Sequence, residues 1–168
     1  MDSIARKKVF DFLKKHNIVF ECYEHPAAAT VEEALRHSEN MCDATHCKNL
    51  FLRNRKGTLH FLVIMEWSKK LDIHRLGEII GEGHLSFASP DRMMKYLGVT
   101  PGSVSLFGVI NDIDNDVLLI IDSELDSAPK LSFHPNDNTA TLVIDNVGFH
   151  NFLKYCGNKH KFITIDDH

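Results

Sequence analysis

The 168 residues make a chain the length of one domain, and its 43% hydrophobic and 25% charged residues exclude a disordered or fibrous protein. No apolar run approaches the ~20 residues that span a bilayer, and the N-terminus lacks the apolar core of a signal peptide, so we expect a cytoplasmic protein without membrane contact. The net charge of −4 argues against broad electrostatic coating of duplex nucleic acid, although it leaves room for a local contact.

Four helices and a β-hairpin are predicted between the N-terminus and residue 98. Apolar residues at helical spacing, N-capping side chains and glycine stops define the helices, and two apolar runs around a Gly-containing turn define the hairpin. The elements are a helix at residues 4–16, a strand at 18–24, a short helix at 30–36, a polar loop at 38–46, strands at 48–53 and 58–65, a helix at 72–81, an extended segment at 85–88 and a helix at 89–98.

The second half of the chain predicts mostly strands. Its elements are a loop at residues 99–105, a strand at 106–110, an acidic turn at 111–116, strands at 117–122, 130–133 and 139–144, a helix at 145–157 and a last strand at 160–165. Strands outnumber helices and βαβ alternation is weak. We therefore expect an α/β fold of α+β-like organisation, with one compact domain over residues 1–168 and a mixed, largely antiparallel sheet surrounded by helices.

Three polar stretches could carry chemistry, and each also has a purely structural explanation. His134 opens a Pro-Asn turn between two strands, where a histidine can be incidental. Lys48 lies at the start of a hairpin strand, where a lysine can simply extend to water. The loop of small residues 102–105 can bring backbone groups close to a cavity, or it can be an ordinary connection.

The cysteines and histidines give little support for a metal site. The four cysteines form no Cys-x-x-Cys pair, which fits a reducing compartment. His46 and Cys47, with Cys42 nearby, are the one cluster to consider, but their spacing matches no usual zinc motif. We therefore expect no metal and assign no cofactor.

Taken together, Lys48-Asn49, Gly102-Ser103-Val104-Ser105 and the stretch from His134 to Thr141 resemble the YbaK/ProX superfamily. Residues 30–34 and 86–90 add to the resemblance, which covers the chain from the first helix to at least Ile144. These proteins are relatives of the editing domain of bacterial prolyl-tRNA synthetase, and the likeness is closest to the free-standing ProX-type deacylases. The resemblance implies a mixed, partly barrel-like sheet and hydrolysis of the ester between a wrong amino acid and tRNA, above all alanyl-tRNA for proline.

The resemblance also implies the site. Lys48 and His134 fall on catalytic positions, where the lysine would supply positive charge near the ester and the histidine would orient the aminoacyl group or water. We expect substrate contacts from Thr30, Asn49, Gly102, Ser103, Val104, Ser105, Asn136 and Asn138. The sequence departs from the family at Leu106, which replaces the proline of a Gly-x-x-x-Pro loop. It also carries three alanines at 27–29, which could widen the pocket enough for serine.

The expected partner is the acceptor end of a mischarged tRNA, with a transient contact to prolyl-tRNA synthetase as a further expectation. Two other functions stay open: a non-catalytic module of the same fold that binds tRNA ends or a synthetase, and a hydrolase of another small ester or amide. Covalent catalysis by Cys47 is disfavoured because no paired base is evident.

Overall fold

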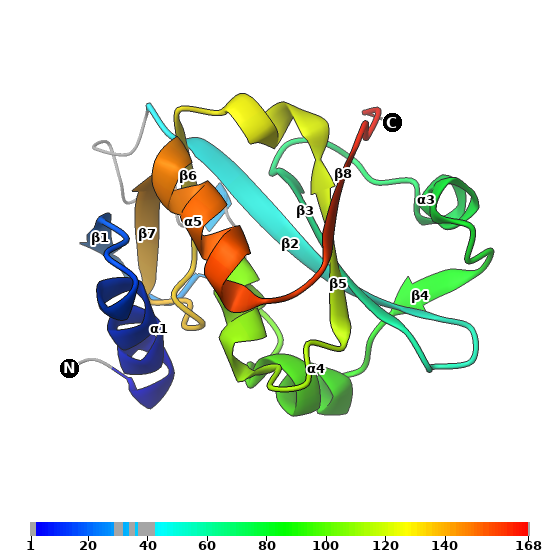
Figure 1. Cartoon of the computed structure of the whole chain (residues 1–168), viewed down its shortest axis with the longest axis horizontal. Coiled ribbons are helices and arrows are strands. Elements are labelled where there is room, and N and C mark those ends of the chain that lie inside the picture. Colours follow the sequence, from blue (N-terminus) through cyan, green and yellow to red (C-terminus); the bar gives the residue numbers. More distant parts are fainter. Residues whose placement is uncertain (1–2, 29–31, 34–35, 37–42, 168) are drawn as a thin grey trace.

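A central eight-stranded sheet organises the chain (Figure 1). The computed structural model describes residues 3–28, 32–33, 36 and 43–167. The strands are β1 (Phe20–Glu24), β2 (Thr45–Asn54), β3 (His60–Glu66), β4 (Leu85–Phe87), β5 (Val117–Asp122), β6 (Lys130–Phe133), β7 (Ala140–Asp145) and β8 (His160–Ile163). The helices are α1 (Ile4–Lys15), α3 (Ile73–Ile80), α4 (Pro90–Leu97) and α5 (Asn146–Cys156), with 3-10 helices η2 (Leu106–Asn111) and η3 (Ser123–Ser127).

The strand order is β1-β7-β6-β2-β3-β5-β8, and β4 pairs with β2 beside this path. The β1–β7, β6–β7, β2–β3 and β2–β4 pairs are antiparallel, whereas β2–β6, β3–β5 and β5–β8 are parallel. The expected mixed, largely antiparallel sheet with surrounding helices is therefore confirmed. The sheet is open, because β1 and β8 stand at the two ends of this order. The expected partly barrel-like sheet therefore does not close into a barrel.

The two faces of the sheet cover separate hydrophobic cores. Side chains alternate between faces along a strand, so neighbours in β2 enter different cores. Phe51 packs in the larger core, to which α1, α4, η2 and α5 contribute. Leu52 packs in the smaller core together with Leu76 of α3. This division decides which residues of β2 can reach a common site.

Local capping chemistry sets the helix ends as predicted. Side chains of Ser3, Asp72, Ser89 and Asp145 accept hydrogen bonds from the first turns of α1, α3, α4 and α5. Glycines with positive φ end α3, α4 and α5, where a residue without a Cβ costs least. No helix formed by the described residues is long and apolar enough to cross a membrane.

Two of the predicted elements were wrong, and a third cannot be compared with the structure. Residues 106–110 form η2 instead of a strand, because a short apolar run can equally be a buried helical turn, and Leu106 to Val109 are all buried. The polar loop predicted at 38–46 ends earlier, since Thr45 and His46 already belong to β2, where they pair with β6. Most of the helix predicted at 30–36, including Thr30, lies outside the described residues.

His60 is a buried histidine that the fold keeps neutral. It is 2% exposed, its Nε2 accepts a hydrogen bond from Nη1 of Arg92 at 2.8 Å, and its ring lies 4.1 Å from that of Tyr96. Burial, together with the positive charges of Arg92 and Lys95, lowers the pKa of His60 from 6.5 to about 4. Protonation of this ring therefore opposes folding.

We predict that stability falls as the pH drops from about 6.5 to about 4. In this window the unfolded chain binds a proton at residue 60 and the folded chain does not, which lowers the free energy of unfolding by up to about 3 kcal/mol. His60→Gln keeps an acceptor for Arg92 and cannot titrate, so urea unfolding at several pH values should show a shallower decline. The exposed His84→Gln is the matched control. An unchanged decline in His60→Gln would contradict the assignment.

Candidate functional site

The candidate site begins at a gap in the pairing of β2. On the edge of β2 away from β3, β6 pairs with Thr45 and His46 and β4 pairs with residues 52–54. Among the described strands, none pairs with residues 47–50 on that edge. The start of η2 lies at this gap, where Oδ1 of Asn49 accepts a hydrogen bond from the backbone N–H of Leu106 at 3.0 Å.

A second side-chain amide, that of Asn136, binds the next residue of η2, Phe107. Nδ2 of Asn136 donates to the carbonyl oxygen of Phe107 at 3.3 Å. Asn136 is 5% exposed and adopts a positive φ of 59°, which asparagine tolerates better than most residues. The structure therefore brings Asn49, the start of η2 and the turn after His134 together.

The loop that leads into η2 presents backbone donors. Gly102 has a positive φ of 88°, and the N–H of Ser103 is already bound by the carbonyl oxygen of Thr100 at 3.1 Å. Within the described part of the chain, the N–H groups of Val104 and Ser105 donate to no other residue. Val104 is half-buried whereas Ser105 is fully buried, so of these two groups the N–H of Val104 is the one that can meet a substrate oxygen.

Ser105 lies entirely in the interior, its backbone as well as its side chain. Its side chain is fully buried, and its Oγ accepts a hydrogen bond from the N–H of Phe107 at 3.2 Å. Ser105 is the N-cap of η2. The carbonyl oxygen of Asn138 accepts a hydrogen bond from the N–H of Ala28 at 2.9 Å, which fixes the turn, and the substrate contact of Asn138 stays a prediction.

His134 is half-buried and neutral. Its Nδ1 lies 3.0 Å from the carbonyl oxygen of Ala140, so Nδ1 carries the proton and Nε2 is left as an acceptor. Burial lowers the pKa of His134, an effect that the hydrogen bond to Ala140 only partly offsets. A neutral imidazole with a fixed tautomer can accept a hydrogen bond from water or from a substrate amino group.

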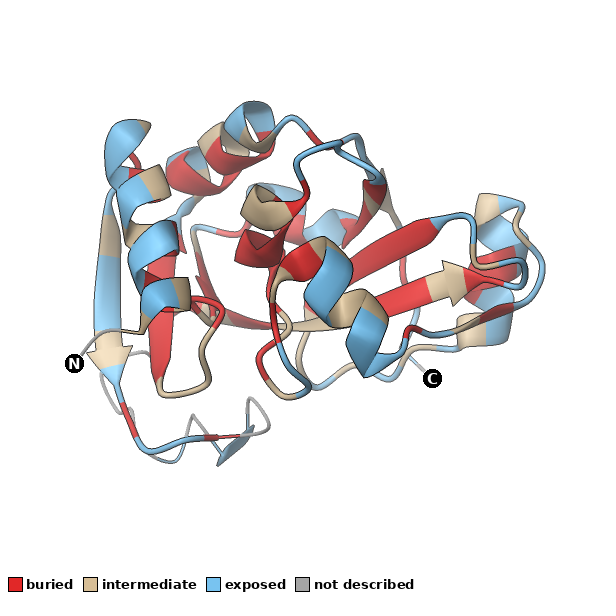
Figure 2. Cartoon of the chain, turned by 90° about the horizontal axis from the view of Figure 1, so that it is seen from below, coloured by how far each residue is buried: buried red, intermediate tan, exposed pale blue. Residues whose placement is uncertain are grey.

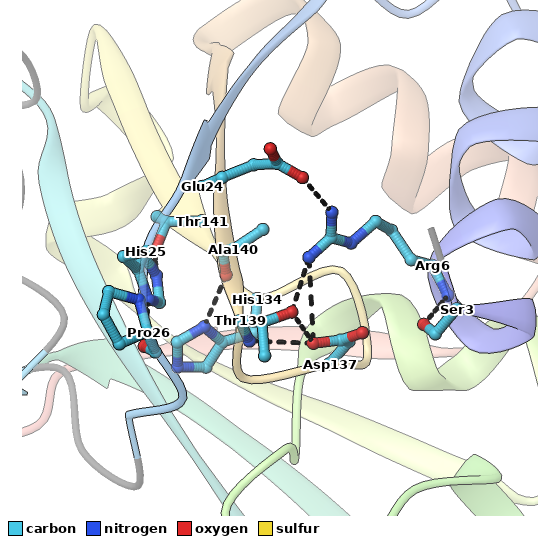
Figure 3. A network of polar contacts seen from close by, with 10 residues as sticks. All are labelled: Ser3, Arg6, Glu24, His25, Pro26, His134, Asp137, Thr139, Ala140 and Thr141. Atoms are coloured by element: carbon cyan, nitrogen blue, oxygen red, sulfur yellow. Dashed lines mark hydrogen bonds and ion pairs between the residues drawn. The ribbon is translucent and has the colours of Figure 1, made fainter. Parts of the chain in front are cut away.

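His25 is a neighbour that the sequence did not single out. Its ring centroid lies 6.2 Å from that of His134. Both of its nitrogens are engaged, Nδ1 with the carbonyl oxygen of Pro26 at 2.8 Å and Nε2 with Oγ1 of Thr141 at 2.9 Å. His25 therefore packs against His134 and holds the end of β1 on β7 (Figure 3).

A buried arginine fastens α1 to the turn that carries His134 (Figure 3). Arg6 is 3% exposed and donates to Oε1 of Glu24 at 2.7 Å and to Oγ1 of Thr139 at 2.6 Å. Its guanidinium also lies 3.8 Å from Oδ1 of Asp137. Burial raises the pKa of Asp137, but hydrogen bonds from Thr139 and Ser3 and the charge of Arg6 outweigh it, so the pKa stays below its usual value.

Lys48 lies three residues inside β2, not at its start, and it faces away from Asn49. The register places Lys48 opposite Met65 of the smaller core and Asn49 opposite Ile64 of the larger core. The ammonium group of Lys48 donates to the carbonyl oxygen of Lys69. Burial lowers the pKa of Lys48.

The cysteine and histidine next to Lys48 have structural roles. Cys47 is 3% exposed, and burial raises the pKa of its thiol, which disfavours the thiolate that covalent catalysis would need. Nδ1 of His46 lies 2.6 Å from Oγ of Ser132. Within the described residues, no group of three or more His, Cys, Asp or Glu side chains could hold a metal ion. Cys42 lies outside those residues.

Comparison with known proteins identifies the family. Residues 25–152 match the aminoacyl-tRNA editing domain. The prolyl-tRNA editing protein ProX of Acetoanaerobium sticklandii is 38% identical over 165 residues, which cover 98% of this chain and 100% of that protein. The chain belongs to the aminoacyl-tRNA editing domain family.

More distant members of the family and of the fold agree. Prolyl-tRNA synthetase associated domain-containing protein 1 of Mus musculus is 31% identical over 150 residues, covering 87% of this chain and 88% of that protein. The crystal structure of a proposed trans-editing enzyme for prolyl-tRNA synthetase superposes with a TM-score of 0.72 and covers 100% of both chains. Its 16% identity shows the shared fold. The expected resemblance is confirmed.

Leu106 acquires a role within this editing domain. A proline at this position would have no N–H, whereas Leu106 donates its N–H to Asn49. The departure from the family's Gly-x-x-x-Pro loop therefore replaces a rigid ring with a side-chain hydrogen bond. Arg6 was missed because a charged residue is normally assigned to solvent, although its spacing from Val9 and Leu13 places all three on the buried side of α1.

We predict that Arg6→Met lowers the free energy of unfolding by about 2–4 kcal/mol, because Thr139 and Asp137 lose their buried partner. Lys7→Met, at an exposed neighbouring position of α1, is the control and should change stability by less than about 0.5 kcal/mol. Urea unfolding measures both. Equal effects of the two substitutions would show that the Arg6 network does not hold α1 in place.

The hydrogen bond between Asn49 and Leu106 predicts a coupling that a double-mutant cycle can measure. Asn49→Ala should lower the free energy of unfolding by about 1–2 kcal/mol, because it leaves the N–H of Leu106 without a partner. In the Leu106→Pro chain this N–H does not exist, so Asn49→Ala should cost about 1 kcal/mol less there. Additive effects in urea unfolding would contradict the proposed link.

Proposed function

We propose that this editing domain is a trans-acting aminoacyl-tRNA deacylase, which hydrolyses the ester of mischarged tRNA and acts on Ala-tRNA(Pro). Membership of the editing family and the relation to the protein named ProX support the reaction class. The single observation that carries the mechanism is the junction at η2. There the loop of Val104 and Ser105 leads into a helix that Asn49 holds at β2 and Asn136 ties to the turn of His134.

The ester bond of an aminoacyl-tRNA is already activated, so the site must mainly position water and stabilise the oxyanion. The N–H group of the half-buried Val104 provides a donor for the oxygen that becomes negative when water attacks the carbonyl carbon. Such a donor acts without reorganising, because Gly102 and the clamped start of η2 fix the loop.

His134 acts as a neutral acceptor in this proposal. Its Nε2 binds the attacking water or the amino group of the aminoacyl moiety, while Nδ1 stays bonded to Ala140. The hydroxyl of the ribose next to the ester takes part in proton transfer, so the site needs no strongly basic side chain. Asn136 positions the turn, and Gly102 and Ser103 shape the loop.

Lys48 supplies positive charge for the phosphate and ester of the terminal adenosine. To do so, its ammonium group exchanges the carbonyl oxygen of Lys69 for the substrate. Thr30 remains a proposed substrate contact.

Alanine is smaller than proline, so a narrow pocket can admit the first and reject the second. Pockets that differ by one methylene discriminate by only ~1–3 kcal/mol, which makes serine the next acceptable amino acid. Ala28 is 1% exposed and lies in the interior, so any widening by the alanines at 27–29 is limited there to residue 27 or 29. We further propose a cytoplasmic enzyme that meets prolyl-tRNA synthetase transiently.

A second candidate is a non-catalytic module that binds tRNA ends. The observation that favours it is the position of Lys48, whose ammonium group is bound to Lys69 on the face away from Asn49. A module of this kind would bind a mischarged tRNA and leave its ester intact.

We predict that Lys48→Ala abolishes release of labelled alanine from Ala-tRNA(Pro), whereas Lys70→Ala, at a nearby exposed lysine, keeps the wild-type rate. A panel that includes Ser-tRNA and Pro-tRNA measures selectivity in the same assay, with Pro-tRNA expected to stay intact. Circular dichroism verifies that both variants fold. Unchanged turnover in Lys48→Ala would rule out its role, and binding without alanine release by the wild type would favour the module.

A further inference from the structure

Helix α1 carries a concentration of positive charge in a chain that is acidic as a whole. Its twelve residues contain five basic side chains and one acidic side chain, Asp11, which amounts to a formal charge of +4 in a chain whose net charge is −4. Only Arg6 is buried, where Glu24 and Asp137 balance it. The four remaining basic residues are the exposed Lys7, Lys8, Lys14 and Lys15.

These four lysines, the lysine face of α1, form no salt bridge with any described residue. Other lysines differ in this respect, since Lys69 pairs with Asp122 at 2.7 Å and Lys130 pairs with Asp43 at 3.1 Å. At 3.6 residues per turn, the four positions fall within roughly 120° of the helix circumference. The same arc contains the exposed Asp11, which lies three or four residues from each lysine, so the outward side of α1 carries four positive charges and one negative charge. This side of α1 is coloured as exposed near the N-terminus in Figure 2.

The lysine face borders the elements of the proposed site. An open groove separates α1 from the end of η2, and its lining residues are Lys8, Asp11, Phe12 and Lys15 of α1 with Ile110, Asn111 and Ile113. At the other end of α1, Arg6 is bonded to Thr139 in the turn of His134. The helix is thus fixed to both parts of the site, and a molecule that lies along it reaches η2.

We propose that the lysine face of α1 binds the phosphate backbone of the substrate tRNA while its aminoacyl end occupies the site at η2. This proposal rests on the proposed function for the identity of the RNA. Lysines attract phosphates through their charge and without sequence preference, whereas lysine is depleted from protein–protein interfaces relative to the rest of a protein surface. An acidic protein surface is therefore the less favoured occupant.

The test compares two variants that remove the same charge. The first replaces the lysine face by the substitutions Lys7→Gln, Lys8→Gln, Lys14→Gln and Lys15→Gln, which retain good helix formers. The matched control removes four exposed lysines elsewhere, by Lys56→Gln, Lys95→Gln, Lys159→Gln and Lys161→Gln. Thermal unfolding verifies that both variants fold.

Binding of uncharged tRNA(Pro) is measured between 50 and 300 mM salt, roughly the range in which phosphate contacts are resolved. The lysine-face variant should bind at least about tenfold more weakly, with a salt slope shallower by about 3. The control should match the wild type. Equal losses in both variants, or no loss in the first, would overturn the proposal.

Deacylation assays on two substrates distinguish a loss of RNA binding from damage to the site. The lysine-face variant should lose kcat/KM on Ala-tRNA(Pro) but keep the wild-type rate on the alanyl ester of adenosine, which has no phosphate backbone. Equal losses on both substrates would overturn the proposal. A wild type that hydrolyses neither substrate would refute the proposed function alone, because tRNA binding still reports on the lysine face. Loss of binding to prolyl-tRNA synthetase with unchanged tRNA binding would identify a protein partner instead.

Discussion

The clamp on the first turn of η2 is the constraint on which the rest of the site depends. Asn49 binds the N–H of Leu106 from β2, and Asn136 binds the carbonyl oxygen of Phe107 from the turn after His134. Packing of Leu106, Phe107 and Val109 in the larger core buries η2, and the two amides fix its position, since the hydrogen bonds of a short 3-10 helix are few. The clamp fixes the loop before η2 relative to His134, and thereby the N–H of Val104 relative to Nε2 of His134.

The sequence predicted those parts of the fold that depend on neighbouring residues. Caps at Ser3, Asp72, Ser89 and Asp145 and glycine stops act over one helical turn, so their side chains can be identified without a structure. The strand prediction within Leu106–Asn111 was wrong because a segment buried on all sides is apolar throughout. It lacks the periodicity that distinguishes a strand from a helical turn. The pairing of β2 with β6 could not be predicted from the sequence either, because β6 lies far from β2 along the chain.

The site could be predicted in composition but not in arrangement. The resemblance named Asn49, the 102–105 loop and the turn of His134, and the structure brings these three together. It could not reveal that Ser105 is a buried cap, that the carbonyl oxygen of Asn138 binds the N–H of Ala28, or that Lys48 faces the other core. Arg6 was missed because its partners come from β1 and from the turn, more than a hundred residues away in the latter case.

The central claim is that the aminoacyl group binds at the junction of β2, η2 and the turn of His134. NMR titration with a non-hydrolysable amide analogue of 3′-alanyl-adenosine tests it most directly. The account predicts the largest backbone shifts at Val104 and Ser105, together with a shift of Nε2 of His134. Shifts confined to the opposite face of the sheet, around Lys69 and α3, would contradict it.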